Sequence, residues 1–383
     1  MTTDFIDRAI AFTRDHVAPH AQSWERDRVV PIETFRAAGA EGFCRMLVAR
    51  EQGGLGLPFL EAMGLFEEIS TACMAFAFSL TVQNNMARSV ATAGSADQVA
   101  RYLPGLISGE TVAAFLLTEP GAGSDAAAIT TTARRDGDGW VIDGAKAWAT
   151  NGATADLLCI FAQTDASQAN TKDKWRGIAT FLVEADNPGV ERLPAYELMA
   201  GHAMGTGGFV FSGCRVGDDA LFRGPGVGFK EAMRGINVAR AGVGAMCCGM
   251  LRAGLDTALK YAAERQAFGQ ATVEFQGLQW RLADVATDLE AARLLTRAAA
   301  RAIDEAKESG NAGAVAAAHA KKFATRVTLK GLADCMQVMG AAGFKADHPL
   351  GRHLACAKMA QYLDGTTEIQ NLIIARDLMR RDN

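Results

Sequence analysis

Residues 361–370 read QYLDGTTEIQ, and this stretch lies directly before the last helical run of the sequence. Asp and Gly are common turn residues and Thr is a fair helix cap, so the string alone predicts a turn that leads into a helix. The same string places one carboxylate, that of Asp364, beside the flexible Gly365. Whether this carboxylate does chemistry depends on the motifs that accompany it along the chain.

The composition is that of a globular protein with more than one packed unit. The chain has 383 residues, of which 49% are hydrophobic and 21% charged, so it should divide into two or three units. A formal net charge of -4, without a long basic run, argues against nucleic acid as a partner. No secretion signal is recognisable, and the apolar run 72–82 is too short to span a bilayer, so we expect a cytoplasmic protein with no membrane partner.

The cysteines and histidines show no pattern typical of disulfides or metal sites. The eight cysteines lie mostly in apolar segments without CxxC or Cys/His ligand spacing, which predicts reduced thiols in the core. The six histidines also lack ligand spacing, so no metal is predicted. His319 falls on the apolar face of a predicted helix, and we interpret it as a core residue.

The periodicity of apolar residues changes twice along the chain. It is helical from residue 5 to about 107, with one break at the glycines of EQGGLGLP, residues 51–58. Short apolar runs separated by Gly, Asp, Asn and Pro then indicate strands, before the helical period returns. The sequence therefore predicts an α+β protein with an N-terminal helical domain (1–110), a middle β domain (111–225) and a C-terminal helical bundle (226–383).

Residues 118–125 read TEPGAGSD and formally match the dinucleotide fingerprint GxGxxA. The context argues against that match, because Pro120 precedes the glycines and residues 128–133 are extended in character. A strand that runs into a glycine-rich loop remains. Its backbone N–H groups and the Ser124 hydroxyl could approach a flat, acceptor-rich ligand, although a structural turn is an equal alternative.

Three further stretches carry residues suited to a cofactor. Trp148 and Thr150, in WATNG, could share one side of a strand and cover a ring, although Trp148 taken on its own would be interpreted as ordinary core. Arg265 in AERQAFGQ and Gln276 in VEFQGLQW follow a predicted helix. Residues 337–343, QVMGAAG, indicate a helix end followed by a loop that allows close approach.

Taken together, in this order and over nearly the whole chain, these strings resemble the acyl-CoA dehydrogenase family of flavoproteins. The matching signatures are TEPGAGSD, W-x-T-N-G, ER-x-x-FG, Q-x-x-G and (E/D)GT-x-x-IQ. The resemblance implies a helical domain, a β-barrel-like middle domain and a C-terminal four-helix bundle that bind FAD. It also implies a homotetramer built as a dimer of dimers, an acyl-CoA substrate, and an electron-transfer flavoprotein as the electron acceptor.

The resemblance also assigns roles to individual residues. The residues that it places around the flavin ring are Leu117, Thr118, Ser124, Trp148 and Thr150. Those that it places on the FAD of a neighbouring subunit are Arg265, Phe268, Gln276, Gln337, Val338, Gly340 and Ala341. Those that it places on the diphosphate or ribitol region are Thr366 and Glu368. Those assigned to the substrate are Ser124, Asn237, Arg240, Gly365 and Arg376.

The chemistry of the family explains why a carboxylate is needed. A thioester acidifies its α-carbon only moderately, so a base must remove the α-proton while the carbonyl oxygen is polarised by hydrogen bonds, here near the Gly365 N–H. The β-hydrogen leaves as hydride to the flavin N5. The resemblance makes Asp364 the base, and burial beside an acyl chain should raise its pKa.

The base position departs from the common pattern of the family, which has glutamate there. The missing methylene withdraws the carboxylate by about 1.5 Å, so the substrate must compensate or the activity differs. Aspartate is found in the members that act on alicyclic thioesters, which makes cyclohexanecarboxyl-CoA the leading expectation, with short or branched acyl-CoA beside it. Ala239 occupies a second base position of the family and cannot serve.

Two other functions stay open on the same fold. One is a flavin-site lyase or desulfinase that eliminates a β-substituent without net oxidation, against which the acidic Asp364 argues. The other is a dehydrogenase of an acyl group bound to a carrier protein, or a relative that binds such a carrier without catalysis. Binding to a carrier but not to free CoA thioesters would favour it.

Overall fold

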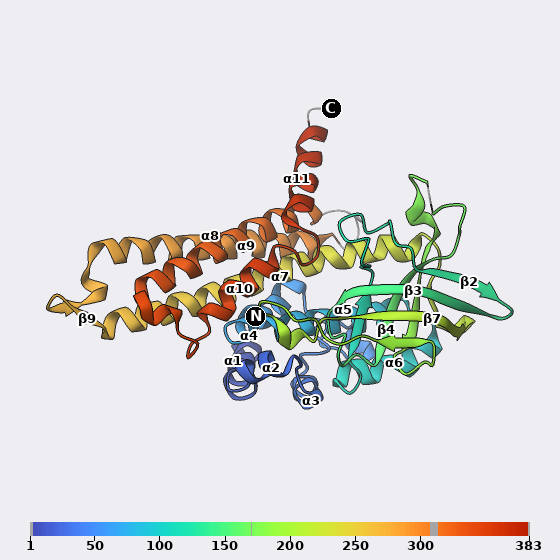
Figure 1. Cartoon of the computed structure of the whole chain (residues 1–383), viewed down its shortest axis with the longest axis horizontal. Helices are drawn as coiled ribbons and strands as arrows, with labels where there is room; N and C mark the ends of the chain where they lie inside the picture. The colour runs from blue at the N-terminus through green and yellow to red at the C-terminus, as the bar shows by residue number, and fades with distance from the viewer. Residues whose placement is uncertain (1–2, 170, 307–312, 382–383) are drawn as a thin grey trace.

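The protein is described by a computed structural model over residues 3–169, 171–306 and 313–381. The sheet lies at one end of the molecule, and the longest helix, α7, runs from the sheet to the far end of the helical bundle (Figure 1). The predicted fold class and the order helices, strands, helices are therefore confirmed.

The N-terminal helices pack around α5, which is buried along most of its length. Phe76 of α5 is the centre of an aromatic cluster with edge contacts to Trp24 and Phe35. The next helix begins with a reciprocal cap, because Ser95 accepts from the Gln98 N–H and the Gln98 side chain accepts from Ser95. The six helices are α1 (Thr3–Phe12), α2 (Ala21–Asp27), α3 (Ile32–Ala40), α4 (Phe59–Ser70), α5 (Met74–Ala93) and α6 (Ala96–Ser108).

The middle of the chain forms an eight-stranded sheet with strand order β6-β7-β3-β2-β4-β5-β8, in which β1 also pairs with β4. The strands are β1 (Ala113–Leu116), β2 (Thr132–Asp136), β3 (Gly139–Ala149), β4 (Leu157–Gln163), β5 (Ile178–Glu184), β6 (Val190–Arg192), β7 (Gly207–Gly217) and β8 (Leu221–Arg223). Strand β4 is buried on both faces, which explains its continuous apolar sequence. Strands β1 and β4 are parallel, whereas β4 and β5 are antiparallel.

Strand β3 is irregular toward its C-terminal end, where the sequence had suggested simple alternation. Its register with β7 shifts between Lys146 and Ala149, and Trp148 has a φ of 58°. Thr150 lies beyond the end of the strand and is buried, whereas the Trp148 side chain is 60% exposed. The expectation that Trp148 and Thr150 share one side of a strand was therefore wrong, because the bulge turns Trp148 outward.

The C-terminal helices pack closely where small residues face large ones. A Cβ on Gly254 would lie 2.5 Å from Leu332, and one on Gly331 would lie 2.6 Å from Leu251, so α7 and α9 could not approach as they do with larger residues. Helix α11 projects away from the bundle in Figure 1. The elements are α7 (Val227–Glu264), β9 (Gln266–Ala267), β10 (Gln270–Ala271), α8 (Gln276–Glu305), α9 (Ala314–Met339), α10 (Leu350–Ala360) and α11 (Thr367–Arg381).

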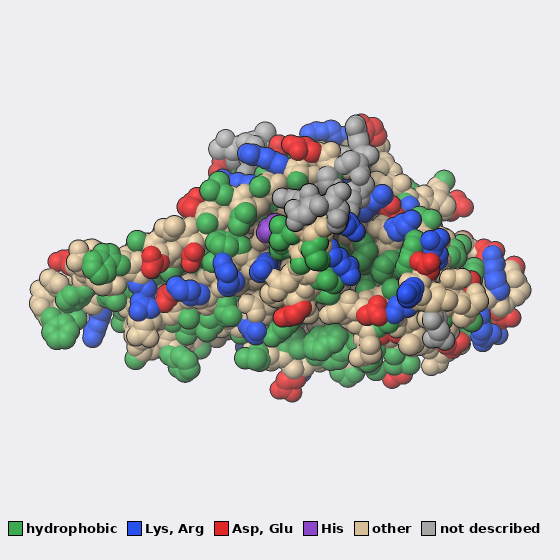
Figure 2. Space-filling view, turned by 90° about the horizontal axis from the view of Figure 1, so that it is seen from above, with side chains coloured by type: hydrophobic (Ala, Val, Ile, Leu, Met, Phe, Trp, Pro, Cys, Tyr) green, Lys and Arg blue, Asp and Glu red, His purple; other side chains and the backbone are tan. Residues whose placement is uncertain are grey.

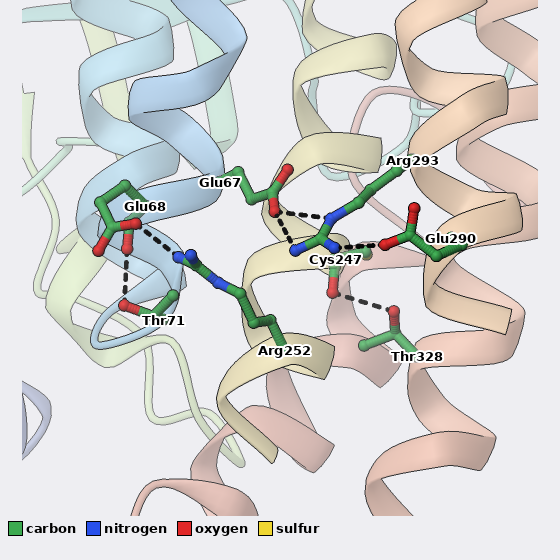
Figure 3. A network of polar contacts seen from close by, with 8 residues as sticks. All are labelled: Glu67, Glu68, Thr71, Cys247, Arg252, Glu290, Arg293 and Thr328. Atoms are coloured by element: carbon green, nitrogen blue, oxygen red, sulfur yellow. Dashed lines mark hydrogen bonds and ion pairs between the residues drawn. The ribbon is translucent and has the colours of Figure 1, made fainter. Parts of the chain in front are cut away.

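Ion pairs join the N-terminal helix α4 to the bundle (Figure 3). Arg293 of α8 donates to Glu67 at 2.8 Å and also to Glu290 of its own helix. Arg252 of α7 lies 2.5 Å from Glu68. The side chains of the two α4 pairs are partly withdrawn from solvent, so these pairs are less screened than surface pairs and fix how α4 lies across α7 and α8.

Other expectations can be compared with the structure directly. All eight cysteines are free and buried, which confirms the prediction of core thiols. His319 is exposed, so its interpretation as a core residue was wrong. Both signs of charge are interspersed over the face seen in Figure 2. Within the described residues, no helix combines the length and apolar character needed to cross a membrane.

Candidate active site

Asp364 lies in a sharp turn between α10 and α11. Asp364 has a φ of 50° and Gly365 one of 92°, so two successive residues adopt the left-handed region. Aspartate is among the non-glycine residues that tolerate this region best, and glycine adopts it freely. A Cβ at Gly365 would also lie 3.2 Å from an Arg240 nitrogen. The DG pair therefore suits both the backbone conformation and the available space.

Side chains from three helices hold this turn through its backbone carbonyls. Arg240 of α7 donates through Nε to the Asp364 carbonyl at 2.9 Å. Lys321 of α9 donates through Nζ to the Gly365 carbonyl at 2.6 Å. Gln370 of α11 donates to the same carbonyl at 2.8 Å. Because these bonds go to the backbone, they position Asp364 without occupying its carboxylate.

The carboxylate itself is withdrawn from water. Oδ2 of Asp364 is enclosed and has no hydrogen-bond partner among the described residues. Burial raises the pKa of Asp364 to about 6, against the opposing charges of Lys321 and Arg240, which favour its ionised form. A carboxylate with such a pKa is mostly ionised at neutral pH and is a stronger base than an ordinary aspartate.

Asp364 opens into a cavity of about 650 Å³ between α5, the first half of α7 and the sheet. This volume lies within the range of small-molecule sites. The apolar part of its lining includes Phe78, Val82, Met86, Phe115 and Phe161, and the polar part includes Arg88, Ser89, Thr180, Arg223, Glu231 and Arg234.

The α7 wall of the cavity contains Asn237, one of the residues assigned to the substrate. Asn237 Oδ1 accepts a hydrogen bond from Arg240 Nη1 at 2.8 Å. Burial lowers the pKa of Arg240, against the effect of Asp364, and the side chain is 8% exposed. Asn237, Arg240, Asp364 and Gly365 thus lie together, and their roles toward a substrate stay predictions. Ala239 also lines the cavity and offers only a methyl group.

The TEPGAGSD loop meets the end of β3 at the edge of the sheet. The Ala147 N–H donates to the Thr118 carbonyl at 2.9 Å, which brings residues 117–118 next to Trp148. A Cβ added to Gly121 or Gly123 would meet nothing within 4 Å, so the loop is open on that side. Two of the predicted stretches therefore form one surface with an exposed tryptophan ring.

A buried ion pair supports the surface formed by the TEPGAGSD loop and the end of β3. Lys146 and Glu119 are both almost inaccessible to solvent and lie 2.8 Å apart. Glu119 also accepts from the N–H groups of Thr130 and Thr131, and Lys146 donates to the Leu117 carbonyl. Burial acts to raise the pKa of Glu119, but the Lys146 charge and the hydrogen bonds from Lys146, Thr131 and Thr130 together outweigh it and lower the pKa to about 2.

A second group of predicted cofactor residues lies at the far end of the bundle from the sheet. Figure 1 places the β9 hairpin there, and its neighbours include Arg265, Phe268 and Gln276. The end of α9 lies at the same tip, because Arg281 near the start of α8 pairs with Asp334 near the end of α9. Figure 2 shows apolar side chains gathered at this tip, where Phe268 is 97% exposed.

Residues 337–341 lie beside the hairpin at this tip. Gln337, Gly340 and Ala341 are exposed, whereas Val338 is buried. One chain therefore does not bring this group together with Trp148. Whether the two groups bind one cofactor stays a prediction.

The remaining predicted residues lie apart from the cavity lining. Ser124 is exposed in the glycine loop, and Arg376 is exposed ten residues after Thr366 on α11, which spans about 15 Å. Thr366 and Glu368 flank the start of α11, and backbone and Thr366 hydrogen bonds lower the pKa of Glu368. Their roles stay predictions.

Sequence reasoning missed the buried cations of the site. Lys321 and Lys146 are each 1% exposed, and Glu119 is 4% exposed. A lysine within the alanine-rich start of α9 is a weak signal, since lysine is rarely buried unless it is paired. Glu119 belongs to the TEPGAGSD stretch, but its partner Lys146 lies 27 residues away, and no pattern in the sequence around Lys146 indicates the pairing.

Three family models match the chain in order. They are the acyl-CoA dehydrogenase N-terminal domain over residues 2–110, the middle domain over 114–214 and the C-terminal domain over 226–379. The chain belongs to the acyl-CoA dehydrogenase family. The members similar to it are FAD-dependent oxidoreductases, so the predicted enzyme class and cofactor are confirmed at the level of the family.

Curated relatives within this family match over almost the whole chain. The mitochondrial short-chain specific acyl-CoA dehydrogenase of Mus musculus is 35% identical over 370 residues, covering 96% of this chain and 88% of the relative. The mitochondrial isobutyryl-CoA dehydrogenase of Dictyostelium discoideum is 31% identical, covering 99% and 89%.

Solved structures of similar proteins have the same fold. A chain from a study of the electron transferring flavoprotein of Acidaminococcus fermentans superposes with a TM-score of 0.92 at 34% identity, covering 99% of both chains. The protein PigA, solved with FAD and proline, superposes with a TM-score of 0.91 at 27% identity, covering 99% of this chain and 97% of PigA.

Proposed function

We propose that this protein is an FAD-dependent acyl-CoA dehydrogenase in which Asp364 removes the α-proton of the acyl thioester. The observation that carries the proposal is the enclosed, unbonded Oδ2 of Asp364 at the wall of a cavity of suitable size. Catalytic bases are commonly carboxylates whose pKa is raised toward neutrality by burial, as it is here.

In the proposed reaction Asp364 accepts the α-proton on a carboxylate oxygen, and the electron pair of that C–H bond becomes part of the new α,β double bond. Backbone N–H groups near Gly365 polarise the thioester carbonyl as negative charge develops on its oxygen. FAD, when bound, accepts the β-hydrogen with its electron pair. Arg240 and Asn237 position the thioester end against the turn, since both belong to the same hydrogen-bonded group.

We propose further that the preferred acyl group is branched at its α-carbon, as in cyclohexanecarboxyl-CoA or isobutyryl-CoA. The aspartate base is one methylene shorter than glutamate, so a substrate that brings its α-proton closer would compensate, which is the argument for the alicyclic thioester. The similarity to an isobutyryl-CoA dehydrogenase favours the same feature in a smaller substrate. Straight short chains are the main competitor, because a short-chain specific enzyme is also similar.

The surface around Trp148 fits a flavin ring. An exposed tryptophan, an open glycine loop and the partly exposed Thr118 lie side by side, and apolar rings with a polar edge bind well to such surfaces. Leu117, Thr118, Ser124, Trp148 and Thr150 would hold the ring.

The cofactor residues at the tip of the bundle would belong to the FAD of another copy of the chain. Arg265, Phe268 and Gln276 are exposed at that tip, remote from the chain's own Trp148. The homotetramer and the electron-transfer flavoprotein as acceptor complete the proposal, as do Thr366 and Glu368 on the diphosphate or ribitol and Arg376 on the substrate.

The test is anaerobic titration of the holoenzyme with cyclohexanecarboxyl-, isobutyryl-, butyryl- and octanoyl-CoA, with flavin absorbance as the readout. We expect fast bleaching with an α-branched thioester and its loss in Asp364→Asn. Asp186→Asn, an exposed aspartate of the β5–β6 loop, is the matched control and should bleach normally.

Each of the other possible results of the titration would lead to a different conclusion. Bleaching that survives Asp364→Asn would remove the base from its proposed role. Fast bleaching by butyryl-CoA alone would refute the branched substrate but keep the dehydrogenase. Product formed without any electron acceptor would identify a lyase, and reaction only with a carrier-bound thioester would identify the carrier-dependent enzyme.

A further inference from the structure

Lys321 is a buried cation next to the turn that bears Asp364. It lies on α9, 1% of the residue is exposed, and its Nζ donates to the Gly365 carbonyl at 2.6 Å and to the Gln361 carbonyl at 3.4 Å. It therefore ties the first and fifth residues of the turn to one point on a long, rigid helix. We propose that Lys321 is a positioning residue, which holds the Asp364 turn in its catalytic conformation and places a positive charge beside it.

Asp364 and Gly365 are both left-handed, a conformation that costs free energy at Asp364 and persists only where the surroundings enforce it. The Gly365 carbonyl accepts hydrogen bonds from both Lys321 of α9 and Gln370 of α11, and these bonds hold the carbonyl toward the two helices. Without Lys321 the hydrogen bonds that join the turn to α9 are lost, and only Arg240 and Gln370 remain to hold its carbonyls, so the carboxylate could shift.

The charge of Lys321 also acts on Asp364. Lys321 and Arg240 are the cations that favour the charged form of Asp364. Asp364 and Glu368 in turn favour the protonated Lys321, whereas Arg240 opposes it. Burial lowers the pKa of Lys321 to about 8, so the lysine still carries its charge at neutral pH. Its Nζ bonds to carbonyls, so the charge acts on Asp364 through space and leaves Oδ2 available for the substrate proton.

This inference rests on the proposed role of Asp364 as the base. The experiment measures anaerobic flavin reduction in the holoenzyme by isobutyryl-CoA and cyclohexanecarboxyl-CoA between pH 5 and 9. The variants are Lys321→Met, which removes the charge and the donor, and Lys321→Gln, which removes the charge and keeps a donor. Lys322→Met is the matched control, because Lys322 is the adjacent residue and no described hydrogen bond joins its side chain to the turn.

In Lys321→Met the rate of flavin reduction should fall by about tenfold to a hundredfold, the range expected for a displacement approaching 1 Å. The pH at which the rate is half maximal should rise by about one unit, because the loss of a nearby positive charge raises the pKa of a carboxylate. Lys321→Gln should show the same rise in half-maximal pH with a smaller loss of rate, and Lys322→Met should match the wild type in both.

The outcomes separate the inference from the proposed function. If the wild type itself is not reduced by any thioester, the proposed function fails. If the wild type is reduced and both Lys321 variants keep its half-maximal pH, the charge has no role and the inference is overturned. A role in folding alone would change stability and flavin content without moving the half-maximal pH. Should Lys321→Met not fold, the glutamine variant decides between these outcomes.

Discussion

Replacing Asp364 by asparagine should make the protein more stable while it abolishes turnover. The pKa of Asp364 rises from 3.8 to about 6 on folding, because the folded environment disfavours the charge more than water does. Between these pH values the native state binds more protons than the unfolded state, so the wild type loses stability as pH rises. At 1.36 kcal/mol per pH unit the full difference is about 3 kcal/mol. Asparagine has no charge to bury and avoids this cost.

The magnitude depends on pH in a way that can be measured. The gain in the free energy of unfolding of Asp364→Asn over the wild type should be about 3 kcal/mol at pH 8 and about half of that at pH 5. Urea unfolding of the two holoenzymes, followed by circular dichroism at both values, gives the difference. Asp186→Asn serves as the control and should show no such trend. A difference that is flat between pH 5 and 8, or a variant less stable than the wild type at pH 8, would refute the burial argument.

Three further predictions concern the same site. The rate of flavin reduction in the wild type should rise with pH, reach half its maximum near pH 6 and level off above about pH 7, because only the ionised Asp364 accepts a proton; initial rates from pH 5 to 7.5 check this, and a fall over that range would contradict it. Phe78→Ala should enlarge the cavity and raise kcat/KM for octanoyl-CoA relative to isobutyryl-CoA by about tenfold, measured with both thioesters; an unchanged ratio would place Phe78 outside the acyl path. Glu119→Gln leaves Lys146 buried without a counter-charge and should cost about 3 kcal/mol of stability. It should also lower the flavin-to-protein absorbance ratio of the purified protein, and equal stability and flavin content would show that the pair is dispensable.

The order of the three structural parts could be predicted because it is carried by local patterns. Helical spacing marks α7, α8 and α9, and the continuous apolar run of β4 marks a buried strand. The DG pair at Asp364 and Gly365 predicts a turn, and both residues do adopt positive φ. The domain boundaries at 110 and 225 stay a prediction, although the matched family domains end and begin near them.

What could not be predicted depends on contacts between distant segments. Lys146 and Lys321 are polar residues whose burial follows from partners on other elements, and single-sequence patterns do not encode such pairing. His319 shows the reverse error, because an apolar spacing suggested burial of a residue that is exposed on α9. The turned-out ring of Trp148 follows from a bulge whose register depends on β7.

The contacts of the Asp364 turn also affect the order in which the site can form. Asp364 is bonded to Arg240, 124 positions earlier, and Gly365 to Lys321, 44 positions earlier. During synthesis both helices leave the ribosome long before the turn does, and the N-terminal helices and the sheet can fold first. Asp364 therefore reaches its position only after the segments that hold it are in place. A chain interrupted before residue 361 would retain much of the folded scaffold but would lack the proposed base.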